Sequence, residues 1–109
     1  MAKGIAVNSV DVVIPAFNAK ETIAPAIDSV LRQSVDVVRK IIVVDDGSSD
    51  GTDSVVKGIN SSKIEVHTTV NQGVSSARNY GISMSSAKWV AFLDADDLWV
   101  TSKLEDQLS

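Results

Sequence analysis

The chain has 109 residues, of which 44% are hydrophobic and 22% charged, so we expect one soluble domain at most. It has no cysteine, which excludes a disulfide framework and a thiolate metal site and leaves oxygen atoms or the single histidine, His67, to bind a metal. The net charge is −4 with no basic stripe that would favour nucleic acid, and no apolar run approaches the roughly 20 residues that cross a bilayer, so we expect a cytoplasmic protein with no transmembrane segment in this chain.

Four short β-branched runs predict four strands, each followed by turn residues and then by a segment with helical spacing. This alternation is typical of βαβ units and a mainly parallel sheet. The first, second and fourth runs are nearly continuous in apolar residues, as in strands covered on both faces, whereas the third alternates, as in a half-exposed or edge strand. The runs are residues 10–14, 40–44, 63–68 and 88–93.

Apolar residues at helical spacing predict a helix after each strand. In the first, Thr22 is the expected cap. In the third, the small residues Ala77 and Gly81 lie on the apolar face with Val74 and Met84 and allow a close approach to the sheet. The predicted helices follow Thr22, Gly51-Thr52 and Gly73, and a last one begins within residues 100–109.

Two adjacent acids, Asp45 and Asp46, follow the four aliphatic residues of the second predicted strand. Because successive strand side chains point to opposite faces, only one of them addresses a given pocket, and we expect the other to accept backbone N–H groups and fix the loop. An Asp at the carboxyl end of a strand can accept a hydrogen bond from a base or a ribose. Asp50 or Thr52 can cap the helix that follows.

Two further side chains, Phe17 and Arg78, follow predicted strands. Phe17 comes after Pro15 has ended its strand, and its ring either folds back onto the core or packs on a nucleobase. Arg78 lies in the helix after the third strand, whose N-terminus can receive an anion. Its guanidinium pairs either with a phosphate or with Asp94 or Asp96. The residues alone leave both pairs of alternatives open.

Three carboxylates, those of Asp94, Asp96 and Asp97, follow the fourth predicted strand within four positions. A turn explains one Asp through local hydrogen bonds but explains three less well. Carboxylates this close repel one another, and a bound cation offsets that cost. Because the carboxyl ends of parallel strands meet at one edge, we expect these acids to hold Mg²⁺ or Mn²⁺ against a phosphate-bearing ligand there.

Four blocks of the sequence, in this order, resemble the family 2 glycosyltransferases of GT-A fold. They are VVIPAFN at 12–18, VVDDGSSDGT at 43–52, NQG with ARN within 71–79, and LDADD at 93–97. The resemblance covers essentially the whole chain. It implies a three-layer Rossmann-like α/β fold of the nucleotide-diphospho-sugar transferase kind, with a mainly parallel sheet truncated after the strand of the DxD motif, Asp94-Ala95-Asp96.

The resemblance implies an inverting transfer of a sugar from a nucleotide-diphosphate donor, usually a UDP-sugar, to a saccharide or lipid-linked acceptor, as in polysaccharide or cell-envelope biosynthesis. The DxD acids would bind Mn²⁺ or Mg²⁺ on the diphosphate, so the expected metal ligands are Asp94, Asp96 and, as a further candidate, Asp97. Phe17 stands where the family more often has Tyr. The expected nucleotide-binding residues are Pro15, Phe17, Asn18, Asp46, Arg78 and Asp94.

The general base of such a transfer lies well beyond the DxD motif in the family, so we expect no catalytic residue within the chain and the base beyond Ser109. Glu105 and Asp106 follow the motif too closely for that role. We therefore expect residues 1–109 to be the N-terminal donor-binding part of a glycosyltransferase domain, without its acceptor half and inactive alone. A full-length parent with membrane segments would work at the inner face of the membrane.

Three other classes of protein share single features with the chain. An acid-phosphatase-like hydrolase also carries Asp-x-Asp after an apolar strand, but the 13 residues after Asp96 are too few to build its domain. A receiver-type signalling domain has its acidic pair after the first strand, whereas here the pair follows the second. A non-catalytic nucleotide-binding or structural module stays open as the alternative function.

Overall fold

The computed structural model describes residues 7–108, in which strands and helices alternate strictly. The strands are β1 (Val10–Ala16), β2 (Val38–Asp45), β3 (Ile64–Thr68) and β4 (Trp89–Phe92), and the helices are α1 (Ile23–Leu31), α2 (Thr52–Lys57), α3 (Val74–Met84) and α4 (Lys103–Leu108). Within residues 7–108, no helix combines the length and the apolar character needed to cross a membrane.

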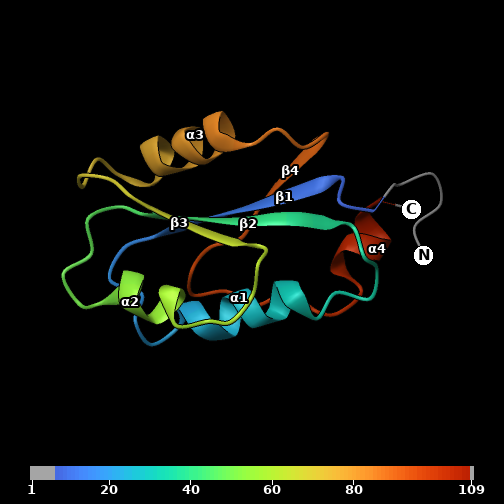
Figure 1. Cartoon of the computed structure of the whole chain (residues 1–109), viewed down its shortest axis with the longest axis horizontal. Coiled ribbons are helices and arrows are strands. Elements are labelled where there is room, and N and C mark those ends of the chain that lie inside the picture. Colours follow the sequence, from blue (N-terminus) through green and yellow to red (C-terminus); the bar gives the residue numbers. More distant parts are fainter. Residues whose placement is uncertain (1–6, 109) are drawn as a thin grey trace.

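The four strands form one sheet in the order β3-β2-β1-β4, and all of its pairings are parallel. Helix α3 covers one face, and α1 and α2 cover the other, which gives three layers (Figure 1). The predicted three-layer parallel α/β fold is confirmed. Because the strands are parallel, the loops that leave their carboxyl ends meet at one edge of the sheet. The predicted site residues lie in these loops, except for Pro15, near the end of β1, and Arg78, in α3.

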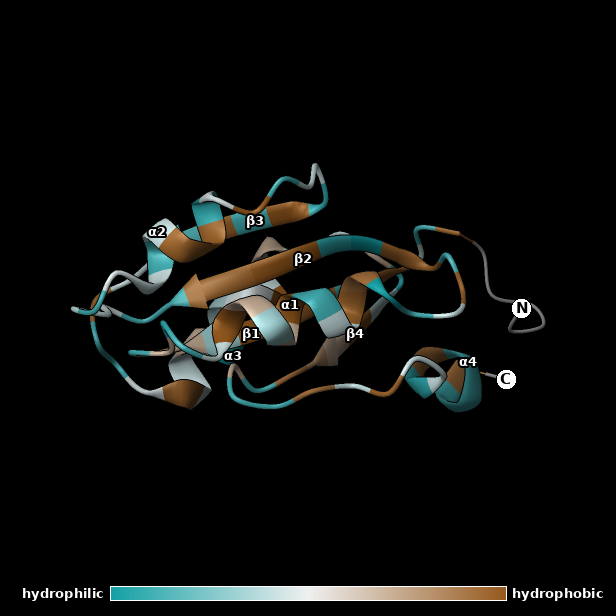
Figure 2. Cartoon of the chain, turned by 90° about the horizontal axis from the view of Figure 1, so that it is seen from below, coloured by the Kyte–Doolittle hydropathy of each residue, from teal (hydrophilic) through white to brown (hydrophobic). Residues whose placement is uncertain are grey.

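The two central strands carry the core. Every residue of β1 is buried, and β2 is buried from residue 41 to its end. Figure 2 accordingly colours β2 hydrophobic over most of its length. Helix α1 packs Ile27 and Val30 against one face, and α3 packs Ala77 against Val13 and Ile42 on the other. Covering on both faces explains why these strands are almost continuously apolar.

The fourth strand does not have the predicted cover on both faces. It lies at an edge of the sheet, and β1 is its only partner among the described strands. Trp89 and Phe92 are 46% and 41% exposed. The third strand lies at the other edge, as its alternating pattern predicts. A run of apolar residues shows that a strand is hydrophobic, but it does not show whether the strand is central or at an edge. That position depends on pairing with distant parts of the chain.

Two helix starts differ in how they are capped. Thr22 precedes α1 as predicted, but its side chain does not cap the helix, because its hydroxyl donates to the Ala19 carbonyl at 3.4 Å. That carbonyl also accepts the N–H of Ile23 at 2.9 Å and so begins the first turn. At α2 the N-cap position is Gly51, so neither predicted cap occupies it, but Asp50, one residue earlier, accepts the N–H of Thr52 on its Oδ1 at 3.0 Å.

A buried ion pair lies at the amino edge of the sheet, the side on which the parallel strands begin. Asp11 in β1 is fully buried, and its Oδ1 and Oδ2 accept from Nε and Nη2 of Arg39 at 3.0 and 2.6 Å. The hydroxyl of Ser85, which follows α3, donates to the same carboxylate at 2.7 Å. The register of β1 with β2 shifts at this point, where Arg39 has no partner opposite. The cluster therefore ties β1, β2 and the connection from α3 to β4 together.

Helix α3 approaches the sheet through small residues. Ala77 and Gly81 are buried as predicted, whereas Val74 and Met84, which were expected on the same face, are exposed. A Cβ on Gly81 would fall inside the van der Waals radii of Val13, within 3.0 Å of Cγ2 and 3.2 Å of Cβ. Leu104 is the buried residue of α4, and Ser109, at the end of that predicted helix, lies outside the described residues.

We predict that Gly81→Ala destabilises the chain, because α3 must move away from the stiff side chain of Val13 at a cost of up to about 3 kcal/mol. This cost exceeds the roughly 1 kcal/mol that Ala contributes to a helix over Gly. Chemical denaturation measures it. The matched control is Gly58→Ala at the end of α2, where the nearest atoms would be 3.5 Å from the new Cβ and stability should hold or rise. Equal effects of the two substitutions would contradict the prediction.

Candidate functional site

Three adjoining hollows follow the carboxyl edge of the sheet, with volumes of about 190, 380 and 440 Å³. Phe17 lies between the first and the second, and Asp94 lies between the second and the third. Each predicted site residue lines at least one of them, so the fold brings the whole predicted set to one edge. That set is Pro15, Phe17, Asn18, Asp46, Arg78, Asp94, Asp96 and Asp97.

The carboxylate of Asp46 binds the loop that leads into α3. It accepts the backbone N–H groups of Gln72 at 3.0 Å and Gly73 at 2.8 Å, and the hydroxyl of Thr69 at 3.0 Å. The residue is 4% exposed and lines the first hollow. The N–H groups before α3 thus receive an anion, as expected of a helix N-terminus, but the anion is the protein's own side chain. Nothing in the sequence pattern indicated Thr69 as a partner.

These donors set the protonation of Asp46. Burial alone would raise the pKa of this carboxyl, but the two N–H groups and the hydroxyl favour its charged form more strongly, so its pKa is lower than usual. Asp46 is therefore an anion at neutral pH. Gly73 makes the contact possible, because its φ of +102° is a conformation that residues with a side chain rarely adopt.

Asp45 has the role predicted for one member of the pair, because it fixes its own loop. It is buried, and its Oδ1 accepts the N–H of Ser48 at 3.0 Å. Asp46 lines the hollow and also fixes a loop, which the alternation of strand side chains did not predict. The two acids therefore hold different loops, one after β2 and one before α3.

Asn18 joins the loop after β1 to the loop after β2. Its backbone N–H donates to Ser48 Oγ at 2.8 Å, and its side-chain Oδ1 accepts the N–H of Ser49 at 2.9 Å. Its φ of +48° is left-handed, a conformation that Asn tolerates better than most residues. Held at this point, the preceding residue, Phe17, keeps its ring 49% exposed beside the first two hollows. Of the two alternatives for this ring, folding back onto the core is excluded.

Arg78 of α3 pairs with Asp94, with Nη2 and Oδ1 3.2 Å apart. This is the ion pair that the sequence left open as the alternative to a phosphate contact. The side chains are 40% and 57% exposed, so the pair contributes little to stability and is open to exchange. Arg78 Nε is buried without a hydrogen-bond partner in the described residues, and its guanidinium carbon lies 6.0 Å from the centre of the Phe92 ring.

The three carboxylates after β4 do not form one cluster. Residues 7–108 contain no group of three acidic or histidine side chains already placed to hold a single ion. Asp94 and Asp96 line the second hollow, whereas Asp97 lines the third and accepts the N–H of Leu98 at 2.9 Å. The buried residues Leu93 and Ala95 alternate with Asp94 and Asp96 and turn both carboxylates outward.

Two carboxylates still fit a hard divalent cation. Mg²⁺ keeps several waters and is usually held by one or two carboxylates together with the phosphate oxygens of a ligand. Asp94 and Asp96 have this chemistry, and the hollow beside them has room for phosphate groups. A cation between these two carboxylates would therefore need further ligand atoms from a bound phosphate and from water.

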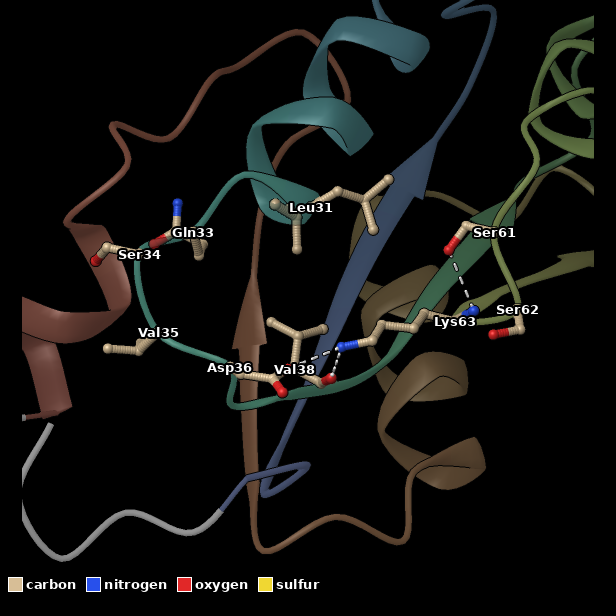
Figure 3. Close-up of a pocket in the computed structure, with 10 residues that line it drawn as sticks. Leu31, Gln33, Ser34, Val35, Asp36, Val38, Ser61, Ser62 and Lys63 are labelled. Carbon is tan, nitrogen blue, oxygen red and sulfur yellow. Dashed lines mark hydrogen bonds and ion pairs between the residues drawn. The ribbon is translucent and has the colours of Figure 1, made fainter. Parts of the chain in front are cut away.

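A fourth hollow, of about 440 Å³, lies at the opposite end of the sheet, between the end of α1 and the segments before β2 and β3 (Figure 3). Its one cation, Lys63, donates to the Val38 carbonyl at 2.7 Å and lies 3.4 Å from Asp36 Oδ1. The protein's own groups satisfy this ammonium, and no predicted site residue lines the hollow. We therefore place the functional site at the carboxyl edge.

Residues 11–109 match the family model described as Glycosyl transferase family 2. One curated relative is the UDP-Glc:alpha-D-GlcNAc-diphosphoundecaprenol beta-1,3-glucosyltransferase WfgD of Escherichia coli, 39% identical over 92% of this chain. Another is the putative teichuronic acid biosynthesis glycosyltransferase TuaG of Bacillus subtilis, 37% identical over 91% of this chain. The chain spans about 40% of the length of each of these relatives.

Two solved structures share the fold. Residues 1–349 of S. aureus TarS, in complex with UDP-GlcNAc, superpose with a TM-score of 0.81 at 26% identity, over 90% of this chain and 29% of that one. The mannosyltransferase PcManGT from Pyrobaculum calidifontis, in complex with GDP-Man and Mn²⁺, superposes with a TM-score of 0.80 at 26% identity, over 92% of this chain and 31% of that one.

We predict that Asp46→Asn destabilises the chain at neutral pH by about 1.5–3 kcal/mol, the usual contribution of hydrogen bonds to a charged group. A lowered pKa stabilises the folded state above the ordinary pKa of Asp, and this contribution is lost as the pH falls through the lowered value. The difference between the two proteins in urea unfolding should therefore shrink in acid. A difference independent of pH would contradict this.

The matched control is Asp28→Asn on α1. Asp28 pairs with Arg32 at 2.7 Å, but both side chains are largely exposed. An exposed pair of this kind contributes about 0.3–0.5 kcal/mol, so the control should unfold almost as the unchanged chain does.

Proposed function

The chain belongs to the family 2 glycosyltransferases, and we propose that it forms the donor-binding part of such an enzyme, where it binds a nucleotide-diphosphate sugar, with a UDP-sugar as the first candidate. The observation that carries this proposal is the continuous row of hollows between Phe17, Asp46 and Asp94. One edge of the sheet thus carries an aromatic ring, an anionic carboxylate beside the proposed nucleobase position, an arginine and two further carboxylates. These are the groups that a base, a ribose and a metal-bound diphosphate require.

In this proposal the ring of Phe17 packs against the nucleobase over the first hollow. Asp46 lines that hollow as an anion. Its three donors come from the protein, so it is rigidly placed before the ligand arrives. A group that is held in position beforehand loses little freedom on binding, which favours affinity.

Asp94 and Asp96 would hold a divalent cation on the diphosphate. When bound, that cation neutralises charge on the leaving diphosphate as the bond to the sugar breaks, and an inverting transfer follows from the family's mechanism. Arg78 is free to exchange its exposed pair with Asp94 for a phosphate oxygen, since the exchange loses little stability. In that arrangement Arg78 pairs with the phosphate, and Asp94 binds the metal.

The acceptor side of the reaction requires a general base, and we propose that this chain does not provide one. Glu105 accepts a hydrogen bond from Ser34 in the connection between α1 and β2, at the other end of the sheet. We therefore propose that the chain alone does not transfer sugar. The WfgD relative's name specifies a diphosphoundecaprenol-linked sugar, so a saccharide or lipid-linked acceptor at the membrane is the acceptor we propose for a longer protein.

We predict that the chain binds UDP more tightly with Mn²⁺ than without it, and that Asp96→Asn removes at least about tenfold of this gain, or ~1.4 kcal/mol of binding free energy. Isothermal titration calorimetry measures both. Asp53→Asn on α2 is the matched control, since Asp53 lines none of the three hollows, and it should bind as the unchanged chain does. Affinity for UDP that is the same with and without Mn²⁺ would refute the metal-dependent site.

We also predict that the chain releases no UDP above background from UDP-sugars when a lipid-linked or saccharide acceptor is present, because it lacks the base. A coupled assay for UDP measures this. Binding without release fits the donor-binding part of an enzyme, and it also fits the alternative function, a nucleotide-binding module without turnover. Release at a rate that depends on acceptor would show that a base lies within this chain.

A further inference from the structure

Three consecutive backbone N–H groups in the loop after β1 donate to side-chain oxygens in the segment after β2. The N–H of Asn18 donates to Ser48 Oγ at 2.8 Å, that of Ala19 to Thr52 Oγ1 at 2.9 Å, and that of Lys20 to Asp50 Oδ2 at 3.1 Å. We call the three acceptor side chains, Ser48, Asp50 and Thr52, the loop clamp. The loop clamp joins residues that are 30 to 33 positions apart in the sequence.

The hydroxyl of Thr52 is fixed as an acceptor. Thr52 is completely buried, and its hydroxyl donates its one proton to Asp50 Oδ1, so the oxygen is left to accept the N–H of Ala19. The hydroxyl of Thr52 is also the main cause of a lowered pKa at Asp50, so that this carboxylate is charged at neutral pH. Groups of the protein itself therefore determine where the acceptors lie.

The need to satisfy buried polar groups explains only part of the loop clamp. Ala19 is buried, so its N–H requires a partner within the protein. Asn18 and Lys20 are exposed, and their N–H groups could donate to water instead. Side-chain partners for all three N–H groups fix the path of the loop, whereas water would leave the loop free to move.

Phe17 is the one residue between β1 and the loop clamp. On one side, Ala16 ends β1 opposite Asp45, and its carbonyl accepts the N–H of Asp46 at 2.8 Å. On the other side is the first clamped N–H, that of Asn18. The Phe17 ring is 49% exposed, so packing against the protein holds it only in part. The place of the ring beside the first hollow therefore depends on the backbone on its two sides.

We propose that Ser48, Asp50 and Thr52 are positioning residues, which hold the loop after β1 so that the Phe17 ring borders the first hollow before a nucleotide binds. This rests on the proposed function, in which that ring packs against the nucleobase. None of the three side chains lines a hollow at the carboxyl edge, so they act through the ring. Without the loop clamp, the ring spends part of its time elsewhere, and the apparent affinity falls with the fraction of molecules that are ready to bind.

Thr52→Val tests the proposal, because Val has the shape of Thr without the hydroxyl. In isothermal titration calorimetry with UDP and Mn²⁺, the dissociation constant should rise about fivefold, as when about one molecule in five has the loop in place. Thr52→Ser keeps the hydroxyl and should bind UDP almost as the unchanged chain does. The matched control is Thr68→Val at the exposed end of β3, which should leave the affinity unchanged.

A double variant with Phe17→Ala separates positioning from a general effect on the fold. If Thr52 acts through the ring, Thr52→Val should have almost no further effect on UDP affinity once the ring is absent. Amide hydrogen exchange without nucleotide gives an independent measurement. The N–H of Ala19 should exchange faster in Thr52→Val, while the amides of β1 stay protected and show that the variant is folded.

Two results would overturn this inference and leave the proposed function in place. One is a UDP affinity that Thr52→Val does not change. The other is an equal loss of affinity with and without the Phe17 ring, which would mean that Thr52 supports the fold in general. If the unchanged chain binds no UDP, the proposed function fails, and this inference fails with it.

Discussion

The carboxylate of Asp46 connects two parts of the chain that are distant in sequence. It lies at the end of β2, and its donors come from the loop between β3 and α3. Through this contact the start of α3 is held beside the first hollow, and the position of α3 in turn determines where Arg78 lies. The arginine meets Asp94 after β4, at the far side of the site. A single buried anion thus sets the distance between the two ends of the row of hollows.

Charged side chains differ between the amino edge of the sheet, where the strands begin, and its carboxyl edge, where they end. At the amino edge, Asp11 is completely buried, and its carboxylate accepts hydrogen bonds from Arg39 and Ser85. The charge there holds parts of the fold together. At the carboxyl edge, Asp94 and Asp96 are exposed, and Arg78 is the cation that pairs with Asp94 within the described residues. Buried pairs are costly to break, whereas exposed carboxylates remain available to a ligand. The sheet is therefore closed at one edge and chemically open at the other.

Local patterns in the sequence were sufficient for the strands, for the close packing at Gly81 and for the meeting of the site residues at one edge. They were not sufficient wherever the outcome depends on a distant partner. The edge position of β4 follows from the strand order, and the donors to Asp46 lie more than twenty residues away from it. The Thr22 hydroxyl donates to the Ala19 carbonyl and does not cap the helix. The density of carboxylates after β4 is visible in the sequence, but the hydrogen bond that Asp97 accepts from the N–H of Leu98 is not.

The strand order has a consequence for how the protein comes to be folded. β1 is the first strand to be synthesised and lies in the middle of the sheet, yet one of its two neighbours, β4, is made only after β2 and β3. Parallel strands need a long crossover between them, and pairing over such separations is slow. During synthesis, therefore, one side of the buried strand β1 stays unpaired until β2, β3 and finally β4 have been made. Chaperones or rapid packing of α1 against β1 would have to protect it in that interval.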